Sequence, residues 1–567
     1  MRMKSINYTR LINVLFIILT TAILCFMLFE DDIFIGHDLR FHMNRIVGIK
    51  EALMDHQFPP KIYPYTNNGY GYASPIFYCD LFLYPFAILY YLGMPLVKCY
   101  KMVLVVYSLL TTCSIFFVLK KIFNKSKIAP YAGTILYVFS NYHLYDLYIR
   151  SALGELFALI FIPLVLYAIY KVLVLHKDSW VFLGVSFAFL LMSHLISFVL
   201  YCVLFAILIL VFIVYNYHDL ALIKKSALTV MKAIILAILL SAWYLLPMIE
   251  QMLDQEFWVN KLSEIYSLEN NIASISSMYN PFTVLEDDHY SVIGVINIGL
   301  VLVVGQYLYI FVKKNGIISI LFILSNIIIL MMIGIIPIYK LDCLSFIQFT
   351  FRLYLLLYPL LVFVLVYTLD KLNLKLGLVI VCLVMLYSVI NLGVMNNSLR
   401  NCPDYYFLNN YTTREMIYDF TSINKDYNST EISGAEYLPF NTINDYLRET
   451  TFIKQINVDG QYEDIIYEYD RSFTNISFTY NSDAEKLVML PLSYYKGYQA
   501  YVLDGDDRVK LDTINVEKYK KVGFNVLEGE HTYICRYDGT LIQNASMFVS
   551  LATVLVLIIK GKKYIND

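Results

Sequence analysis

Long apolar runs alternate with short polar segments along most of this chain. Each run approaches the length of a helix that crosses a bilayer, for which roughly 20 mainly apolar residues are needed. The candidate runs lie near residues 11–29, 75–93, 102–119, 128–143, 156–172, 179–193, 197–215, 230–249, 291–312, 317–338, 353–369, 376–394 and 542–559. Because some are short for a full crossing, the pattern predicts a polytopic α-helical membrane protein with about 11–13 transmembrane helices.

Lys and Arg residues in the short loops indicate the orientation, because cytoplasmic loops are enriched in these residues. Basic segments lie at the N-terminus and at 120–127, 171–177, 224–225, 313–314, 371–375 and 560–563. They can all face one side only if run 75–93 does not make one simple crossing. Pro75, Asp80 and Pro85 in this run favour a broken or re-entrant helix. The rule then places the N-terminus in the cytoplasm and loop 30–74 outside.

Block 395–541 differs in composition, being rich in Tyr, Asn and Asp and poor in long apolar runs. Period-2 alternation predicts strands at 472–480, 487–492, 499–503, 522–527 and 532–537. Asp504-Gly505 and Glu528-Gly529 supply turns between them. Short strands at this spacing predict an extracytoplasmic β-sandwich. The predicted organisation is a transmembrane domain at 1–394, the β-rich domain at 395–541, and a last helix with a basic cytoplasmic tail at 542–567.

Composition agrees with a membrane protein. The chain is 59% hydrophobic and 16% charged, whereas soluble domains are about half apolar and a quarter charged. The net charge of −2 argues against a nucleic-acid partner. There is no CxxC motif; Cys402 and Cys535 lie in the polar C-terminal block, and a disulfide between them stays open.

The first predicted outer loop contains the densest group of ionisable residues. On a helix, Asp38 and His42 would share a face because they are four residues apart. A carboxylate beside an imidazole can act as a general base or a metal ligand, and Arg40 or Arg45 could hold a phosphate. The alternative is an amphipathic helix whose charges pair with each other and with water.

Four further positions interrupt the apolar pattern on the same predicted side. Arg150 and Glu155 lie in the polar turn 141–155, His194 follows an apolar run, and Arg352 lies one helical turn after Gln348. Each also has an ordinary interpretation: an interfacial aromatic belt, a hydrogen bond between helices, or an interfacial anchor.

Two stretches resemble known membrane proteins. Gly36-His37-Asp38-Leu39-Arg40-Phe41-His42, followed by Tyr70-Gly71-Tyr72-Ala73-Ser74-Pro75, resembles the first outer loop of GT-C glycosyltransferases, which carries an acidic catalytic residue. Pro491 to Gly505 and Leu527 to Tyr537 are similar to the C-terminal extracytoplasmic domain of the YfhO family of bacterial membrane proteins.

This resemblance implies a GT-C-like fold in the bacterial cytoplasmic membrane. It implies transfer of a sugar from a polyprenyl-phosphate donor to a cell-envelope polymer, lipid or protein acceptor on the outer face. Asp38 would deprotonate or orient the acceptor hydroxyl, or hold a metal that does so. Arg40, Arg150 or Arg352 would hold the donor phosphate, and the further substrate-binding candidates are His42, Arg45, Glu155 and His194. No organic cofactor is expected, and a divalent cation stays open.

Two other classes of function remain open. A transporter or flippase for lipid-linked saccharides would use the same charges to line a path, and a non-catalytic protein could help to assemble envelope machinery. Polar residues concentrate on the predicted outer side, whereas a transporter needs access from both sides. The asymmetry therefore favours an outer-face enzyme.

Overall fold

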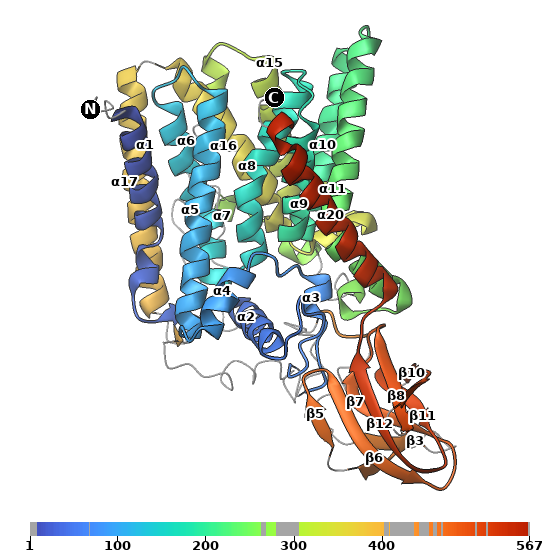
Figure 1. Ribbon diagram of the computed structural model, residues 1–567. Coiled ribbons are helices and arrows are strands. Elements are labelled where there is room, and N and C mark those ends of the chain that lie inside the picture. The colour runs from blue at the N-terminus through green and yellow to red at the C-terminus, as the bar shows by residue number, and fades with distance from the viewer. Residues whose placement is uncertain are drawn as a thin grey trace, which may run out of the picture.

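Apolar helices run side by side through most of the computed structural model, and a β-domain extends from one end of them (Figure 1). We call the end of the helices that bears the β-domain the β-domain end, and the opposite end of the helices the distal end. The structure describes residues 8–66, 69–261, 268–278, 306–372, 374–401, 407–408, 436–440, 453–456, 462–466, 469–504, 507–516 and 520–564.

Within these residues, seven helices are long and apolar enough to cross a membrane. They are α5 (Leu96–Ile122), α8 (Leu153–Leu173), α10 (Leu195–Tyr215), α11 (Leu220–Asp254), α16 (Tyr354–Lys371), α17 (Leu374–Asn401) and α20 (Leu541–Tyr564). Three shorter apolar helices accompany them, namely α1 (Tyr8–Leu24), α9 (Trp180–Ser193) and α15 (Gly316–Met332). The predicted polytopic α-helical class is confirmed; the run 291–312 lies mostly outside the described residues.

Run 75–93 is divided, as Pro75, Asp80 and Pro85 predicted. It forms two short helices, α3 (Ser74–Phe77) and α4 (Tyr84–Tyr91), each with a proline in its first turn. Proline is tolerated there because the first N–H groups of a helix have no acceptor within it. Asp80 lies between the two helices, where it is buried.

Run 128–143 is divided as well, which the apolar pattern did not reveal. It forms α6 (Ala129–Val138) and the short α7 (Asn141–Tyr145), which continues as η2 (Asp146–Arg150), a single π-helical turn. The left-handed backbone of Ser151, with a φ of 57°, ends this turn before α8 begins. The polar residues of the turn are thereby brought into the interior at the β-domain end.

The first loop contributes α2 (Leu39–Met54), which begins directly after Asp38. Figure 1 shows α2 with α3 and α4 between the long helices and the β-domain. Most of α2 is buried, including His42 and Arg45. Solvation by water, one part of the alternative interpretation, is therefore wrong for these two side chains, whereas pairing between neighbouring side chains is observed.

The β-domain consists of two five-stranded antiparallel sheets, ordered β10-β11-β7-β3-β4 and β5-β6-β12-β8-β9. Their strands are β3 (Ile453–Ile456), β4 (Tyr462–Ile466), β5 (Asp470–Ser472), β6 (Asn475–Ser482), β7 (Lys486–Ser493), β8 (Tyr498–Asp504), β9 (Asp507–Leu511), β10 (Ile514–Val516), β11 (Lys521–Val526) and β12 (Gly529–Tyr537). Phe524 of one sheet contacts Phe478 and Tyr533 of the other, with ring centroids 6.2 and 5.7 Å away. The predicted sandwich is confirmed.

Four of the five predicted strands match β7, β8, β11 and β12. The predicted strand 472–480 is wrong at its start, because β5 ends at Ser472 and β6 begins at Asn475. Phe473 turns the chain with a φ of 49°. Because its side chain is buried, the sequence pattern of alternating apolar and polar residues continues through this turn. At the domain borders, α17 continues past residue 394 to Asn401. Cys535 is buried in β12, and Cys402 lies outside the described residues.

Hydrogen bonds join the β-domain to the last turns of α11 and to the first loop. Gln251 of α11 donates to the carbonyl oxygen of Lys496 at 2.7 Å and accepts from its backbone N–H at 3.0 Å. The Ser493 N–H donates to the carbonyl of Tyr70 at 2.8 Å, and the Arg471 guanidinium donates to that of Pro64 at 2.7 Å. The β-domain therefore braces the loop that follows α2.

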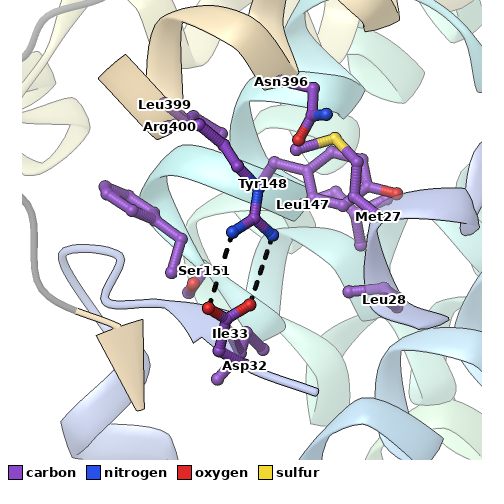
Figure 2. A pocket seen from close by; sticks show the side chains of 11 residues that line it. Met27, Leu28, Asp32, Ile33, Leu147, Tyr148, Ser151, Asn396, Leu399 and Arg400 are labelled. Carbon is purple, nitrogen blue, oxygen red and sulfur yellow. Dashed lines mark hydrogen bonds and ion pairs between the residues drawn. The ribbon is translucent and has the colours of Figure 1, made fainter. Parts of the chain in front are cut away.

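A second connection joins the beginning of the first loop to the end of α17. Strand β1 (Ile33–Phe34) pairs with β2 (Phe407–Leu408), and an Arg400 nitrogen lies 3.2 Å from an Asp32 carboxylate oxygen. Figure 2 shows this ion pair beside a cavity of about 30 Å³. The cavity has room for about one or two water molecules and is too small for a sugar.

Candidate functional site

Arg45 on α2 organises the first of two buried ionic networks at the β-domain end. Its Nε donates to Asp80 Oδ1 at 2.7 Å, and its Nη2 donates to the Cys79 carbonyl at 2.7 Å. The Tyr63 hydroxyl donates to the second oxygen of Asp80. Arg45 and Asp80 are almost completely enclosed, so each charge depends on the other for stabilisation. We call Arg45, Asp80, Tyr63 and His42 the Arg45 network.

His42 connects this network to α8. Its Nδ1 lies 3.0 Å from Arg45 Nη1, and its Nε2 lies 3.2 Å from the backbone nitrogen of Leu153. Burial, reinforced by the Arg45 charge, lowers the pKa of His42 well below its ordinary value. A neutral imidazole carries one N–H and accepts at its other nitrogen. Since both neighbours are donors, only one of the two contacts can be a hydrogen bond.

Glu155, in the first turn of α8, organises the second network. Its Oε1 accepts from Arg150 Nη1 at 3.0 Å and from Arg352 Nε at 3.2 Å, while the Tyr142 hydroxyl donates to Oε2. Arg150 also donates to Asp146 Oδ1 at 2.7 Å. We call Glu155, Arg150, Arg352, Asp146 and Tyr142 the Glu155 network. It joins the neighbouring elements η2 and α8 to η8 (Thr350–Leu353), which is distant from both in sequence.

Tyr78 lies between the two networks. The Arg45 guanidinium carbon is 4.4 Å from the centroid of its ring, at cation–π distance. A side chain at Gly154 would collide with the Tyr78 hydroxyl and would press against His194. Gly154 therefore lets α8 approach both aromatic rings. His194 Nδ1 accepts from the Ser197 hydroxyl at 2.8 Å and caps α10.

Asp38 lies at the edge of these networks and is partly exposed. Its backbone N–H donates to the carbonyl of Arg150 at 2.9 Å, which fixes the start of α2 against η2. A Cβ at Gly36 would come 2.5 Å from the carbonyl oxygen of Ile149, so the approach requires glycine. The Asp38 carboxylate does not cap α2, and no described residue forms an ion pair or a side-chain hydrogen bond with it.

The structure brings most of the sequence candidates together. His42, Arg45, Arg150, Glu155 and Arg352 belong to the networks, and Asp38 and His194 border them. Arg40, in the first turn of α2, belongs to neither network.

Asp80, Asp146, Tyr63, Tyr78 and Tyr142 were not predicted as site residues from the sequence, although Asp80 was recognised as a helix breaker. The signal that could have found Asp80 was a charged residue inside an apolar run, which is rare without a partner or a function. The tyrosines had no comparable signal.

The sequence left open whether the site holds a divalent cation, and the described side chains do not form a suitable set of ligands for one. In the described part of the chain, no three His, Cys, Asp or Glu side chains are grouped so that they could hold a metal ion. The network carboxylates are paired with arginines instead.

Comparison with known proteins identifies the family of the helical part. The model of a family described as "6-pyruvoyl-tetrahydropterin synthase related domain; membrane protein" matches residues 76–398, more than half of the chain. The chain belongs to this family. The membrane class predicted from the apolar runs is thus confirmed. The family region includes Asp80 and the whole Glu155 network, whereas Asp38, α2 and the β-domain lie outside it.

A relative from Lactococcus lactis subsp. cremoris (strain MG1363), named only as an uncharacterized protein, is 28% identical over 348 residues. The aligned part is 59% of this chain and 55% of the relative. The chain thus spans about half the length of that relative.

Proposed function

We propose that this membrane protein is a glycosyltransferase that moves a sugar from a polyprenyl-phosphate donor to a cell-envelope acceptor. The observation that carries the proposal is the state of the carboxylates at the β-domain end. Asp80, Asp146 and Glu155 are each paired with an arginine. Asp38 is partly exposed and has no such partner among the described residues, which leaves it available to a substrate.

The proposed chemistry needs one base and one group that stabilises the leaving phosphate. Asp38 accepts the proton of the acceptor hydroxyl as its oxygen bonds to the anomeric carbon of the donor sugar. The bond between this carbon and the phosphate oxygen breaks, and the polyprenyl phosphate leaves with the electron pair. Its negative charge must be stabilised by nearby cations.

Among the arginines of the two networks, Arg352 is the best candidate for this cation. Its side chain is 11% exposed, compared with 7% for Arg150 and 2% for Arg45. Arg352 already donates to Gln348 and to the carbonyl of Ile347 in the same segment, so its guanidinium is held in place. A phosphate could bind it at the cost of its single contact with Glu155, which keeps Arg150 as a partner.

The first prediction concerns Asp38→Asn in full-length protein. A cell strain that lacks the gene is complemented with wild type or variant, and the sugar composition of its envelope polymers is measured. Loss of the base should reduce transfer about 10²-fold or more. The exposed Asp31 in the same loop supplies the control, and Asp31→Asn should retain full transfer.

The amounts of both variants in the membrane are compared by immunoblot. Reduced transfer shows loss of catalysis only if Asp38→Asn accumulates to the wild-type level. Unchanged glycosylation in Asp38→Asn and in Asp38→Ala would exclude the catalytic role. A complete deletion without any change in envelope sugars would exclude the proposed function itself.

A further inference from the structure

A large cavity lies at the distal end of the helices, far from the networks described above. Its volume is about 950 Å³, near the upper limit of ordinary ligand pockets. Side chains from α8, α10, α15 and α16 line it, among them Ile169, Leu208, Leu321 and Phe363. The lining is mostly aliphatic and aromatic, so the cavity favours a hydrocarbon ligand.

The cavity is accessible from the side at which the helices would meet lipid. Tyr215 and Val211 of α10 and Ile317 of α15 line it, and they are 86, 37 and 36% exposed. Of the four helices named above as lining the cavity, α8, α10 and α16 qualify as membrane spans, and α15 is a shorter apolar helix. A ligand that enters between α10 and α15 would therefore come from the bilayer.

Cations surround the polar end of this cavity. Lys125 and Lys371 both line it, and Lys125 has no ion pair with any described residue. Lys371 forms an ion pair with Asp370, which also lines the cavity; the Asp370 Oδ2 lies 3.3 Å from the Lys371 Nζ. Lys120 and Lys121 end α5, and Lys171 lies in the last turn of α8. These last three lysines lie at the same end of the helices without lining the cavity, whereas Lys125, Lys371 and Asp370 give the lining itself a net positive charge beside an apolar interior.

We propose that this cavity binds an anionic phospholipid from the leaflet on the distal side. Its acyl chains would occupy the space between Ile169, Leu208 and Leu321, and its phosphodiester would lie near Lys125 and Lys371. Basic pockets between transmembrane helices at the cytoplasmic side are known to suit anionic head groups. The Lys-rich loops assign the distal end to that side by the positive-inside rule. A zwitterionic lipid has no net negative charge, so it would not balance the positive charges of Lys125 and Lys371.

The test is native mass spectrometry of the full-length protein, purified in detergent and mixed with defined lipids. Dioleoyl phosphatidylglycerol should be retained in preference to dioleoyl phosphatidylcholine. Leu208→Trp would narrow the cavity where the acyl chains are placed and should reduce retention of both lipids. Leu210→Trp is the matched control, because Leu210 is 63% exposed on the same helix and does not line the cavity.

A second pair of variants tests the head group without disturbing the helices. Lys125→Ala with Lys371→Ala should reduce phosphatidylglycerol binding about tenfold or more. Lys127→Ala with Lys224→Ala removes two exposed charges at the same end and should leave binding unchanged.

Equal retention of the two phospholipids by wild type would overturn the proposal, as would full retention by either cavity variant. Undecaprenyl phosphate is included as a third probe. If it displaced phosphatidylglycerol, the cavity would be part of a substrate path, and the proposal would be wrong even if Asp38 proved catalytic.

Discussion

Lys61 is a largely buried ammonium group close to the Arg45 network. Its Nζ lies 5.8 Å from the ring centroid of Trp243 on α11, and the nearby Asp80 carboxylate favours its charge. Burial has the larger effect and lowers the pKa of Lys61 from 10.5 to about 8. Folding therefore opposes the charged form of this residue.

This shift predicts a pH dependence of stability. Below about pH 8 both folded and unfolded states carry the proton, and the cost of burying the charge is fully present. Between about pH 8 and 10.5 the folded state releases its proton first. The free energy of unfolding should then rise by up to about 1.4 kcal/mol per pH unit from this group.

Lys61→Met removes the titration while keeping a long side chain. In thermal unfolding in detergent, the variant should be more stable than wild type at pH 7, and the difference in Tm should shrink toward pH 10. A difference that stays constant over this range would contradict the assignment.

The residues of the candidate site were partly predictable from the sequence. His42, Arg45, Arg150, Glu155 and Arg352 were recognised because ionisable residues are costly near lipid. Their partners were not, because Arg45 meets Asp80 only after the intervening loop has folded. Tyr63 and Tyr142 could not be recognised among 51 tyrosines.

At the scale of elements, the packing of α2 depends on a glycine. A Cβ at Gly48 would lie 2.3 Å from the ring of Tyr63. The flat face of the helix at Gly48 thus lets this ring pass and reach Asp80 with its hydroxyl. The Arg45 network depends in this way on the absence of one side chain.

Gly48→Ala should therefore destabilise the protein by about 1–3 kcal/mol, since overpacking outweighs the better helix propensity of alanine. Gly393 in α17 is the matched control, because nothing lies within 4 Å of a Cβ placed there. Gly393→Ala should be neutral or stabilising by up to about 1 kcal/mol. Thermal unfolding of both variants distinguishes them; a loss in Gly393→Ala as large as in Gly48→Ala would show that the contact with Tyr63 is not the cause.

The predictability of the elements follows from the kind of signal. Proline and aspartate within run 75–93 are local breakers, and the division into α3 and α4 was predicted from them. The π-helical turn η2 contains no proline and was missed, although Asp146 begins it. The turn at Phe473 was missed because a buried aromatic residue continues the alternation of a strand.

At the scale of the whole molecule, Gln251 of α11 joins the helices to the β-domain through two hydrogen bonds. This side chain is completely buried and satisfies both the N–H and the carbonyl of Lys496. Its loss would leave two backbone groups without their partner at the junction, and unsatisfied buried groups cost about 1–3 kcal/mol.

Gln251→Ala should loosen this junction locally without unfolding the helices. Hydrogen exchange followed by mass spectrometry should show at least about fivefold faster exchange in peptides that contain Lys496. Asn326→Ala on α15, which removes a hydrogen bond within that helix, supplies the control and should leave those peptides unchanged. Unaltered exchange in Gln251→Ala would show that other contacts hold the domain.

The pairing of β1 with β2 has a consequence for biosynthesis. Ile33 pairs with Leu408, so the first strand has no partner until the ribosome has added roughly 375 further residues. At ~5–20 residues per second this takes about 20 to 75 s. Asp38 follows β1 directly, and Arg352, its proposed counterpart, also emerges late. The nascent protein therefore passes most of its synthesis with the candidate site incomplete.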